Sequence, residues 1–298
     1  MRSSMRLRGY RSEVEHLLRA LPSDPVLSLP NLGNAGDSLI YAGTLAALAR
    51  TGVSYEVAAA DTPLTGCTVL LGGGGNLVPL YDSMREALRR CIDEGAGRVI
   101  LLPHTIRHAQ DVLALLRPGD VVGCRDAPSA AHARVAAPRA TTLLAHDMAF
   151  HIDVRELLRN RAVRREAAPV LRARLADHGW TTRRIRAAPI MHFIRQDAEQ
   201  VEGHPESDID ISAALMDPGA GGQPSLVDAW CLLKTIDCSR RIVTDRLHVA
   251  IGAGLLGVPV DLLPNSYDKN ASVYEQSLRS IAGVRWRPDD GRRAVPPA

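Results

Sequence analysis

The chain has 298 residues, of which 36 are Lys or Arg and 33 are Asp or Glu, so its formal net charge is +3. This small positive excess excludes a protein that coats nucleic acid with a polycationic surface, and an aromatic content of 4% is too low for a platform that stacks on single strands. Because 46% of the residues are apolar, we predict a globular protein with an aliphatic core, and the length suggests two domains. The basic residues are almost all arginines, since Lys234 and Lys269 are the two lysines.

The cysteines and the N-terminus suggest a compartment. The five cysteines are odd in number and form no CxxC pair, which favours reduced thiols over a disulfide framework or a zinc site. The basic N-terminal stretch lacks the apolar core of a signal peptide. We therefore expect a cytoplasmic protein, and the basic N-terminus leaves open a peripheral contact with the inner face of a membrane.

Short apolar runs alternate with longer helical patterns along the chain. The runs predicted as strands are 25–29, 54–58, 68–71, 98–102, 120–124, 189–194, 208–212, 241–244 and 258–263. The stretches predicted as helices are 37–50, 81–94, 104–116, 225–239, 246–256 and 271–280, with Gly257 ending the fifth of them. Apolar strands separated by amphipathic helices predict an α/β fold with parallel sheets covered on both faces.

A change of composition divides this pattern. We predict an N-terminal domain over 1–150, a helical connector rich in Arg and Ala over 151–187, and a C-terminal domain over 188–298. The connector is interpreted as a solvated helix face on which Glu166 and Asp177 pair with arginines, and RNA binding is the less favoured alternative.

Open α/β sheets bind ligands beyond the carboxyl ends of their strands, and the first such loop spans 31–37. Its glycines allow the backbone to approach a ligand, and the following helix N-terminus favours an anion. Asn34, Gly36 and Asp37 are the candidate residues for an anion or an acceptor. A tight turn with Asp37 as helix N-cap is the alternative.

Four consecutive glycines, Gly72 to Gly75, form the second such loop and are followed by Asn76. Backbone N–H groups at Gly73 and Gly74 can form an anion-binding nest, and Asn76 would border it. The loop lacks the Gly-Lys-Ser/Thr ending of a P-loop, which disfavours ATP hydrolysis of that type.

Cations follow several later strands. Arg107 and Arg125 lie just beyond two strands of the first domain, where a guanidinium can grip a carboxylate or a phosphate, although pairing of Arg125 with Asp126 is an alternative. In the second domain Arg246 and His248 follow one strand and Lys269 follows the next. Adjacent parallel strands would bring these loops together around an anionic substrate that receives a proton. A core histidine and a solvated loop lysine are the structural alternatives for His248 and Lys269.

At these residues the sequence resembles the polysaccharide pyruvyl transferase family. The matching segments are Asn34-Ala35-Gly36-Asp37, Leu71-Gly72-Gly73-Gly74-Gly75, Arg125-Asp126, Asp245-Arg246-Leu247-His248 and Asn265-Ser266-Tyr267-Asp268-Lys269. Each is weak alone, but their order and their places at strand ends make the set specific. The resemblance covers about 25–280 and leaves the N-terminal region and the Arg-rich connector unmatched.

The resemblance implies two Rossmann-like domains that face each other across a cleft, as in GT-B glycosyltransferases. It implies a transferase that places the three-carbon unit of phosphoenolpyruvate on two sugar hydroxyls as a ketal and releases phosphate. The donor-binding positions carried over are Arg125, Arg246, Leu247, His248 and Lys269, and Arg107 competes with Arg125 for its role. The acceptor would be a saccharide, polymeric, lipid-linked or a small glycoside.

The chemistry of this donor fits the residues. Phosphoenolpyruvate carries a carboxylate and a phosphate, so its site needs several fixed cations. We expect His248 to act as the general acid that protonates the methylene carbon, and Asp37 to orient or deprotonate the acceptor hydroxyl. The scheme needs no cofactor, and no cluster of His, Cys or Asp in the sequence has metal-ligand spacing.

Two other functions remain open. A GT-B glycosyltransferase that uses a nucleotide sugar would share the architecture and an anion site at a helix terminus. A non-catalytic sensor of a phosphorylated metabolite would bind a ligand without turnover.

Overall fold

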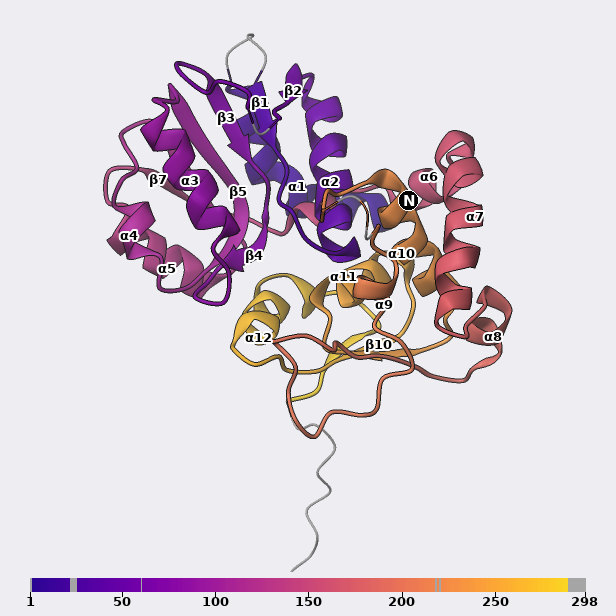
Figure 1. The fold of residues 1–298 in the computed structure, drawn as a ribbon. Coiled ribbons are helices and arrows are strands. Elements are labelled where there is room, and N and C mark those ends of the chain that lie inside the picture. Colours follow the sequence, from indigo (N-terminus) through magenta and orange to yellow (C-terminus); the bar gives the residue numbers. More distant parts are fainter. Residues whose placement is uncertain (1, 22–25, 60, 218, 220, 289–298) are drawn as a thin grey trace, which may run out of the picture. The chain divides into compact units, whose positions relative to one another are not determined.

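The computed structural model describes residues 2–21, 26–59, 61–217, 219 and 221–288 (Figure 1). Contacts divide the chain into two units. Unit 1 consists of Met1–Gly33, Asp37–Asp153 and Pro218–Leu226, and unit 2 consists of Asn34–Gly36, Val154–Asp217 and Val227–Ala298. Each unit contains its own sheet, and every strand pairing within both sheets is parallel. The predicted α/β class with parallel sheets is confirmed.

Seven strands form the sheet of unit 1, in the order β2-β1-β3-β5-β6-β7, with β4 paired to β5 off this path. The strands are β1 (Val26–Leu29), β2 (Tyr55–Val57), β3 (Thr68–Leu71), β4 (Gly74–Leu77), β5 (Arg98–Ile106), β6 (Val121–Cys124) and β7 (Thr141–Leu144). Successive side chains of a strand point to opposite faces, so the apolar residues of the central strands supply two cores.

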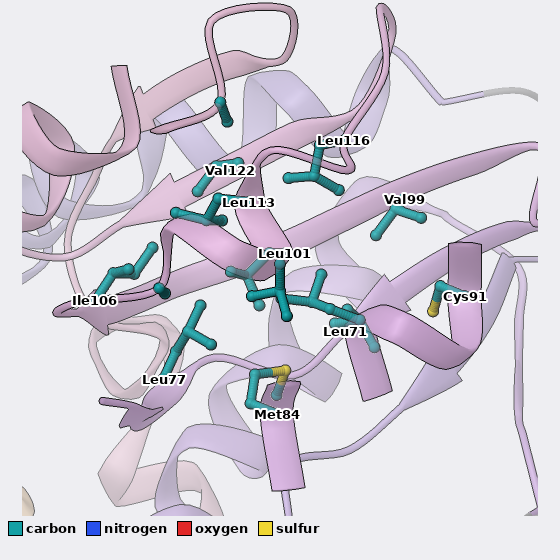
Figure 2. Close-up of a cluster of buried hydrophobic side chains, with 14 of the residues drawn as sticks. Leu71, Leu77, Met84, Cys91, Val99, Leu101, Ile106, Leu113, Leu116 and Val122 are labelled. Atoms are coloured by element: carbon teal, nitrogen blue, oxygen red, sulfur yellow. The ribbon is translucent and has the colours of Figure 1, made fainter. Parts of the chain in front are cut away.

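One core of unit 1 contains Leu71, Leu101 and Val122 of the sheet (Figure 2). The helices that pack there are α3 (Ser83–Asp93), α4 (Gln110–Leu113) and α5 (Ala127–Ala136). The alternating strand residues Leu70 and Ile100 face the other core, which packs against α1 (Arg2–Arg19) and α2 (Ala35–Thr51). A short helical turn, η1 (Met148–His151), closes the unit.

Unit 2 is built on a four-stranded sheet in the order β11-β10-β9-β8. The strands are β8 (Met191–Phe193), β9 (Ile242–Thr244), β10 (Val260–Leu262) and β11 (Val284–Trp286). The helical segments are α6 (Val154–Arg159), α7 (Arg161–Asp177), α8 (Thr182–Ala187), α9 (Ile211–Ala214), α10 (Leu226–Cys238), α11 (Leu247–Leu256), α12 (Lys269–Val273) and the π-helical turn η3 (Tyr274–Leu278). The Arg-rich connector is helical as predicted, since it contains α6, α7 and α8.

Most predicted elements are present, and Gly257 ends α11 in the left-handed conformation at φ 78°. The stretch 104–116 was wrongly predicted as one helix. Strand β5 continues to Ile106, because β4 pairs with it at His104 and Ile106 and satisfies its backbone there, so a single short helix, α4, remains. Helix α5 and strand β7 follow from an Ala-rich stretch and a Thr-Leu stretch for which no element was predicted.

The predicted strand over 208–212 is also wrong. Asp210 instead caps helix α9, because its side chain accepts hydrogen bonds from the backbone of Ser212 and Ala213 at 3.2 and 3.5 Å. Asp37 is not the N-cap of α2, since that helix begins at Ala35 and Asp37 lies in its first turn. Among the described residues, no helix is long and apolar enough to cross a bilayer.

Candidate functional site

The carboxyl ends of three parallel strands in unit 2 meet at one edge of its sheet. Register aligns Phe193 of β8 and Leu262 of β10 with Thr244 of β9. Arg195 follows β8 by two residues and Arg246 follows β9 by two, while Lys269 opens the short helix α12 in the segment after β10. Parallel pairing therefore brings together cations that are far apart in the sequence.

These cations form an ion-pair network with carboxylates. We call it the cation–carboxylate cluster, and its members are Arg195, Asp197, Glu199, Asp210, Arg246 and Lys269. The pairs form a continuous path. Arg246 donates from Nε to Asp210 Oδ1 at 3.0 Å and pairs through Nη1 with Asp197 Oδ2 at 2.8 Å. Arg195 joins Asp197 at 2.7 Å to Glu199 at 2.6 Å, and Glu199 accepts a hydrogen bond from Lys269 Nζ.

Buried carboxylates fix the direction of each cation. Asp210 and Glu199 are buried, and Glu199 also accepts from Asn265 Nδ2 at 3.2 Å. Lys269 is itself buried, and its Nζ lies 5.1 Å from the centre of the Tyr267 ring. A charge held by hydrogen bonds on a rigid strand end loses little freedom when it binds an anion.

Asp197 differs from the other two carboxylates of the cluster because 38% of its side chain is exposed. Partial burial would raise its pKa, but the hydrogen bond from Arg195 and the charge of Arg246 outweigh that effect and lower the pKa to about 2. Burial would lower the pKa of Arg195, but Asp197 and Glu199 raise it. These pKa shifts keep Asp197 and Arg195 ionised near neutrality. In formal charge, the three cations of the cluster match its three carboxylates.

A second layer supports the cluster through Asp245. This buried carboxylate accepts the backbone N–H of Arg195 at 2.9 Å and lies 3.2 Å from Nδ1 of His204. Burial raises the pKa of Asp245, while the contacts with Arg195 and His204 act against that rise. Asn270 donates to the backbone oxygens of Asp245 and Leu263 at 2.7 and 2.9 Å, which ties the loops after β9 and β10 to each other.

His248 and Leu247 lie in the first turn of α11, directly after Arg246, which is the N-cap residue of that helix. Leu247 is buried and His248 is half-buried. The sequence order Arg-Leu-His thus places a cation at the N-cap of α11 and an imidazole two residues later, in the first turn of the helix.

Arg125 and Arg107, the two candidates from the first domain, lie together in unit 1 but differ in exposure. Arg125 is 1% exposed, and it donates to Asp147 at 2.6 Å and to Thr105 Oγ1 at 2.9 Å. Arg107 keeps 16% of its side chain exposed and pairs with Asp126 at 3.1 Å. Asp126 also caps α5, so its pairing with Arg107 links that arginine to the start of the helix. Arg125 pairs with Asp147, and the predicted alternative of pairing with Asp126 is not seen in the described part of the chain.

The glycine run in unit 1 allows close packing of backbones. None of Gly72 to Gly75 has a positive φ, and Gly74 and Gly75 belong to β4. A Cβ on Gly73 would come within 2.9 Å of the Pro103 backbone oxygen, and a Cβ on Gly74 within 2.3 Å of Asn31 Nδ2. These glycines are explained by lack of space for a side chain, without the left-handed conformation of a nest.

Asn76 belongs to a polar chain in unit 1. It donates to Asn31 Oδ1 at 2.8 Å, and its Oδ1 lies 2.8 Å from Nε2 of His104. Burial, followed by the charge of Arg125, lowers the pKa of His104 to about 3, so this imidazole is neutral near pH 7. The sequence analysis did not predict that His104 would be a buried, neutral partner of Asn76, because its stretch was interpreted as a helix.

The loop of Asn34, Gly36 and Asp37 forms the start of α2. Asn34 Oδ1 accepts the backbone N–H of Gly36 at 2.8 Å, and Asn31 Nδ2 lies 3.5 Å from Asp37 Oδ1. A Cβ on Gly33 would collide with the Asp37 carboxylate. Among the described residues, no group of three or more His, Cys, Asp and Glu side chains could hold a metal ion.

Comparison with known proteins now adds to this geometry. Residues 34–267 match the model of the family described as polysaccharide pyruvyl transferase. The chain belongs to the polysaccharide pyruvyl transferase family. The match contains the loop of Asn34, the Arg-Leu-His motif and Asn265, and it ends two residues before Lys269. No curated protein matches the chain.

A solved structure supports the fold. The crystal structure of a functionally uncharacterised protein from Klebsiella pneumoniae subsp. pneumoniae aligns over 94% of this chain and 99% of its own, with a TM-score of 0.72. At 23% identity this likeness concerns the fold alone.

The structure adds Arg195, Asp197, Glu199 and Asp210 to the site residues predicted from the sequence of this family member. One signal was available for Arg195, since it follows a predicted strand just as Arg125 and Arg246 do. Asp197 and Glu199 lie in the segment after it, and Asp210 in a segment wrongly predicted as a strand. Their pairing with Arg246 and Lys269 depends on contacts between distant segments, for which a single sequence carries no pattern.

Proposed function

We propose that the chain transfers the carboxyethylidene unit of phosphoenolpyruvate to two hydroxyls of a saccharide, forming a ketal and releasing phosphate. One observation carries this proposal. Arg246 and Lys269, the two family cations of unit 2, belong to one ion-pair network at the carboxyl end of parallel strands. Family membership supports a transferase that acts on a polysaccharide, and the donor and the ketal chemistry are our inference.

The donor would bind through the cation–carboxylate cluster. Phosphoenolpyruvate brings a phosphate and a carboxylate, whose charges must be matched by fixed cations. Asp210 and Glu199 are buried and would stay in place to orient Arg246 and Lys269. Asp197 is the exposed carboxylate, and we propose that the donor phosphate replaces it on Arg195 and Arg246.

The reaction would proceed as an addition followed by a substitution. His248 gives a proton to the methylene carbon of the donor, which creates an oxocarbenium-like centre at the neighbouring carbon, and the first sugar hydroxyl adds there with loss of its proton. The carbon–oxygen bond to phosphate then breaks, and the second hydroxyl adds with loss of its proton. Of the two protons lost by the hydroxyls, one restores His248 and the other leaves with the phosphate. Asp37 is our proposed group for the acceptor hydroxyl, and Arg125 or Arg107 for a further donor contact.

The proposal also includes the arrangement of the units, the cellular location and the type of acceptor. We propose a GT-B-like pairing of the two units, a cytoplasmic location, and a saccharide acceptor that is polymeric, lipid-linked or a small glycoside. The scheme requires no organic cofactor and no metal, and it includes no nucleic acid partner.

The test combines donor binding with product analysis. The purified protein is titrated by calorimetry with phosphoenolpyruvate, UDP and GDP, and is then incubated with phosphoenolpyruvate and candidate saccharides. We expect heat from phosphoenolpyruvate, phosphate release that depends on the acceptor, and an acceptor heavier by one carboxyethylidene group. Binding of UDP or GDP in place of phosphoenolpyruvate would favour the nucleotide-sugar glycosyltransferase. Binding without phosphate release from any acceptor would favour the sensor.

A matched pair of variants tests the proposed acid. His248→Ala should abolish most phosphate release while phosphoenolpyruvate still binds, because general acid catalysis contributes about 10²-fold to 10⁴-fold. His178→Ala serves as the control, since His178 is an exposed histidine at the C-terminal end of α7 in the same unit. Unchanged turnover of His248→Ala would remove His248 from the mechanism.

A further inference from the structure

A cavity lies in unit 2 among helices that the proposed reaction does not use. It has a volume of about 550 Å³ and is bordered by α6, α7, α8 and α10. Its lining residues are Leu158, Arg164, Ala168, Leu171, Arg172, Thr182, Trp230 and Lys234. These helices include the Arg-rich connector, which no family motif explained.

The helical repeat shapes the floor of this cavity. Arg164, Ala168 and Arg172 are spaced by four residues, so they lie on one face of α7, and the two arginines are about 12 Å apart along its axis. Ala168 leaves a hollow between them. Trp230 and Lys234, also four apart, supply the facing stripe of α10.

Helix α7 and helix α10 are joined by direct contacts, which fix the walls of the cavity relative to each other. Cys231 Sγ lies 3.6 Å from the Ala167 oxygen, and Arg174 pairs with Asp228 at 2.5 Å. Trp230 is buried, and its Nε1 donates to the Leu158 oxygen at 3.4 Å, which joins α10 to α6. These contacts hold the helices that carry the apolar lining in place.

The charge of the lining is of one sign. Three cations border the cavity and no carboxylate does. Lys234 pairs with Asp237 outside the lining at 2.7 Å. The connector carboxylates Glu166 and Asp177, predicted to neutralise these arginines, form no ion pair within the described chain, and neither Arg164 nor Arg172 has a carboxylate partner there.

From this combination we propose that the cavity binds an organic phosphate ester with an aromatic or apolar body. The two arginines and Lys234 would hold the phosphate, because charge-assisted hydrogen bonds to guanidinium groups suit its oxygens. Leu158, Leu171 and Trp230 would cover the organic part. The volume is within the range of about 300–1,000 Å³ that small-molecule sites occupy, and it far exceeds what inorganic phosphate fills. No residue of this lining belongs to the cation–carboxylate cluster.

Equilibrium binding of a fluorescent aryl phosphate tests the proposal. The probe is 4-methylumbelliferyl phosphate, compared with the phosphate-free fluorophore and with inorganic phosphate, in the presence of saturating phosphoenolpyruvate. We expect the ester to bind more tightly than either fragment. Arg164→Ala/Arg172→Ala should weaken it about tenfold or more, as expected for losing a charge-assisted hydrogen bond. Both side chains are exposed and alanine favours a helix, so this variant should fold.

Control variants distinguish binding in the cavity from a general effect of the positive charge of α7. Arg161→Ala/Arg165→Ala removes the same charge from exposed positions of α7 outside the lining and should bind the ester like the original protein. Ala168→Trp fills the hollow without changing charge and should abolish binding. Equal losses in the two double-arginine variants, or unchanged binding by Ala168→Trp, would overturn the proposal.

A second experiment asks whether the bound phosphate belongs to a soluble ester or to a lipid headgroup. Vesicles of phosphatidylcholine with phosphatidic acid are compared with phosphatidylcholine alone in a flotation assay. Capture by the acidic vesicles that Arg164→Ala/Arg172→Ala abolishes, without binding of the soluble ester, would assign the phosphate to a lipid headgroup. Binding of neither probe would overturn the proposal.

Discussion

Arg246 and Asp210 form a buried ion pair in unit 2, with the Nε of Arg246 3.0 Å from Oδ1 of Asp210 and a second contact from Nη2 to Oδ2. The two residues are separated by 36 positions in the sequence. The same carboxylate caps helix α9, so it fixes both a helix start and the guanidinium that precedes the Arg-Leu-His histidine.

Asp210→Asn should therefore lower stability and donor affinity together. Removing one partner of a buried pair leaves the other charge poorly compensated, and we expect the free energy of unfolding to fall by about 3 kcal/mol, since Arg246 keeps Asp197. Urea denaturation measures the loss. The control is Asp261→Asn, because Asp261 is also buried but its partner Arg241 is 39% exposed, and this variant should lose much less.

Asp197→Asn should give the opposite result for the donor. The substitution gives the cluster a net charge of +1 and removes the carboxylate that occupies Arg195 and Arg246, so phosphoenolpyruvate should bind more tightly in calorimetry. Asp237→Asn is the matched control, with the same charge change and the same 38% exposure at the distant Lys234. Weaker donor binding by Asp197→Asn would contradict the proposed replacement of this carboxylate by phosphate.

The same aspartate predicts a pH dependence of stability. Its pKa is about 2 in the folded chain, below the value of about 3.9 for an unfolded aspartate, so its ion pairs stabilise the fold fully above about pH 4. This contribution is lost as the pH falls through about 2. The difference in urea midpoint between the original protein and Asp197→Asn should therefore be constant from pH 7 to about 4 and shrink below it.

The two lysines should respond differently to arginine. Lys269 is buried against Glu199 and Tyr267, where a planar guanidinium does not reproduce a compact ammonium, and Lys269→Arg should reduce kcat/KM for phosphoenolpyruvate about tenfold or more. Lys234 is 31% exposed, and Lys234→Arg should leave donor use unchanged. Steady-state phosphate release at varied donor concentration provides the comparison, and equal kinetics for the two variants would contradict it.

Substituting the two arginines of unit 1 should destabilise the protein to different extents, although each substitution removes the same charge. Arg125→Met leaves Asp147 buried without its guanidinium and should lower the free energy of unfolding by about 3–5 kcal/mol. Arg107→Met removes a partly exposed partner from Asp126, which keeps hydrogen bonds from Thr105 and Ser129, so the loss should be smaller. Urea denaturation of both variants decides the order, and a larger loss for Arg107→Met would contradict this interpretation of burial.

Local chemistry along the chain determined much of this protein. Apolar runs and helical patterns predicted the α/β class and most strands, because a strand buried on both faces of a parallel sheet is a continuous apolar run. Gly257 correctly predicted the end of α11, because glycine adopts the left-handed backbone conformation of a helix end more easily than other residues do. The ordered motifs likewise identified the family before any contact was known.

Tertiary structure decided the partners of the charges. Arg125 is buried against Asp147, Lys269 is held by Glu199, and Arg246 is held by Asp210, and each pair joins segments that are distant in the sequence. The sequence shows that a cation follows a strand, but its desolvation and its counter-charge come from packing of other segments around it. The cavity beside Ala168 follows the same logic, because a small residue becomes a hollow only when neighbouring helices enclose it.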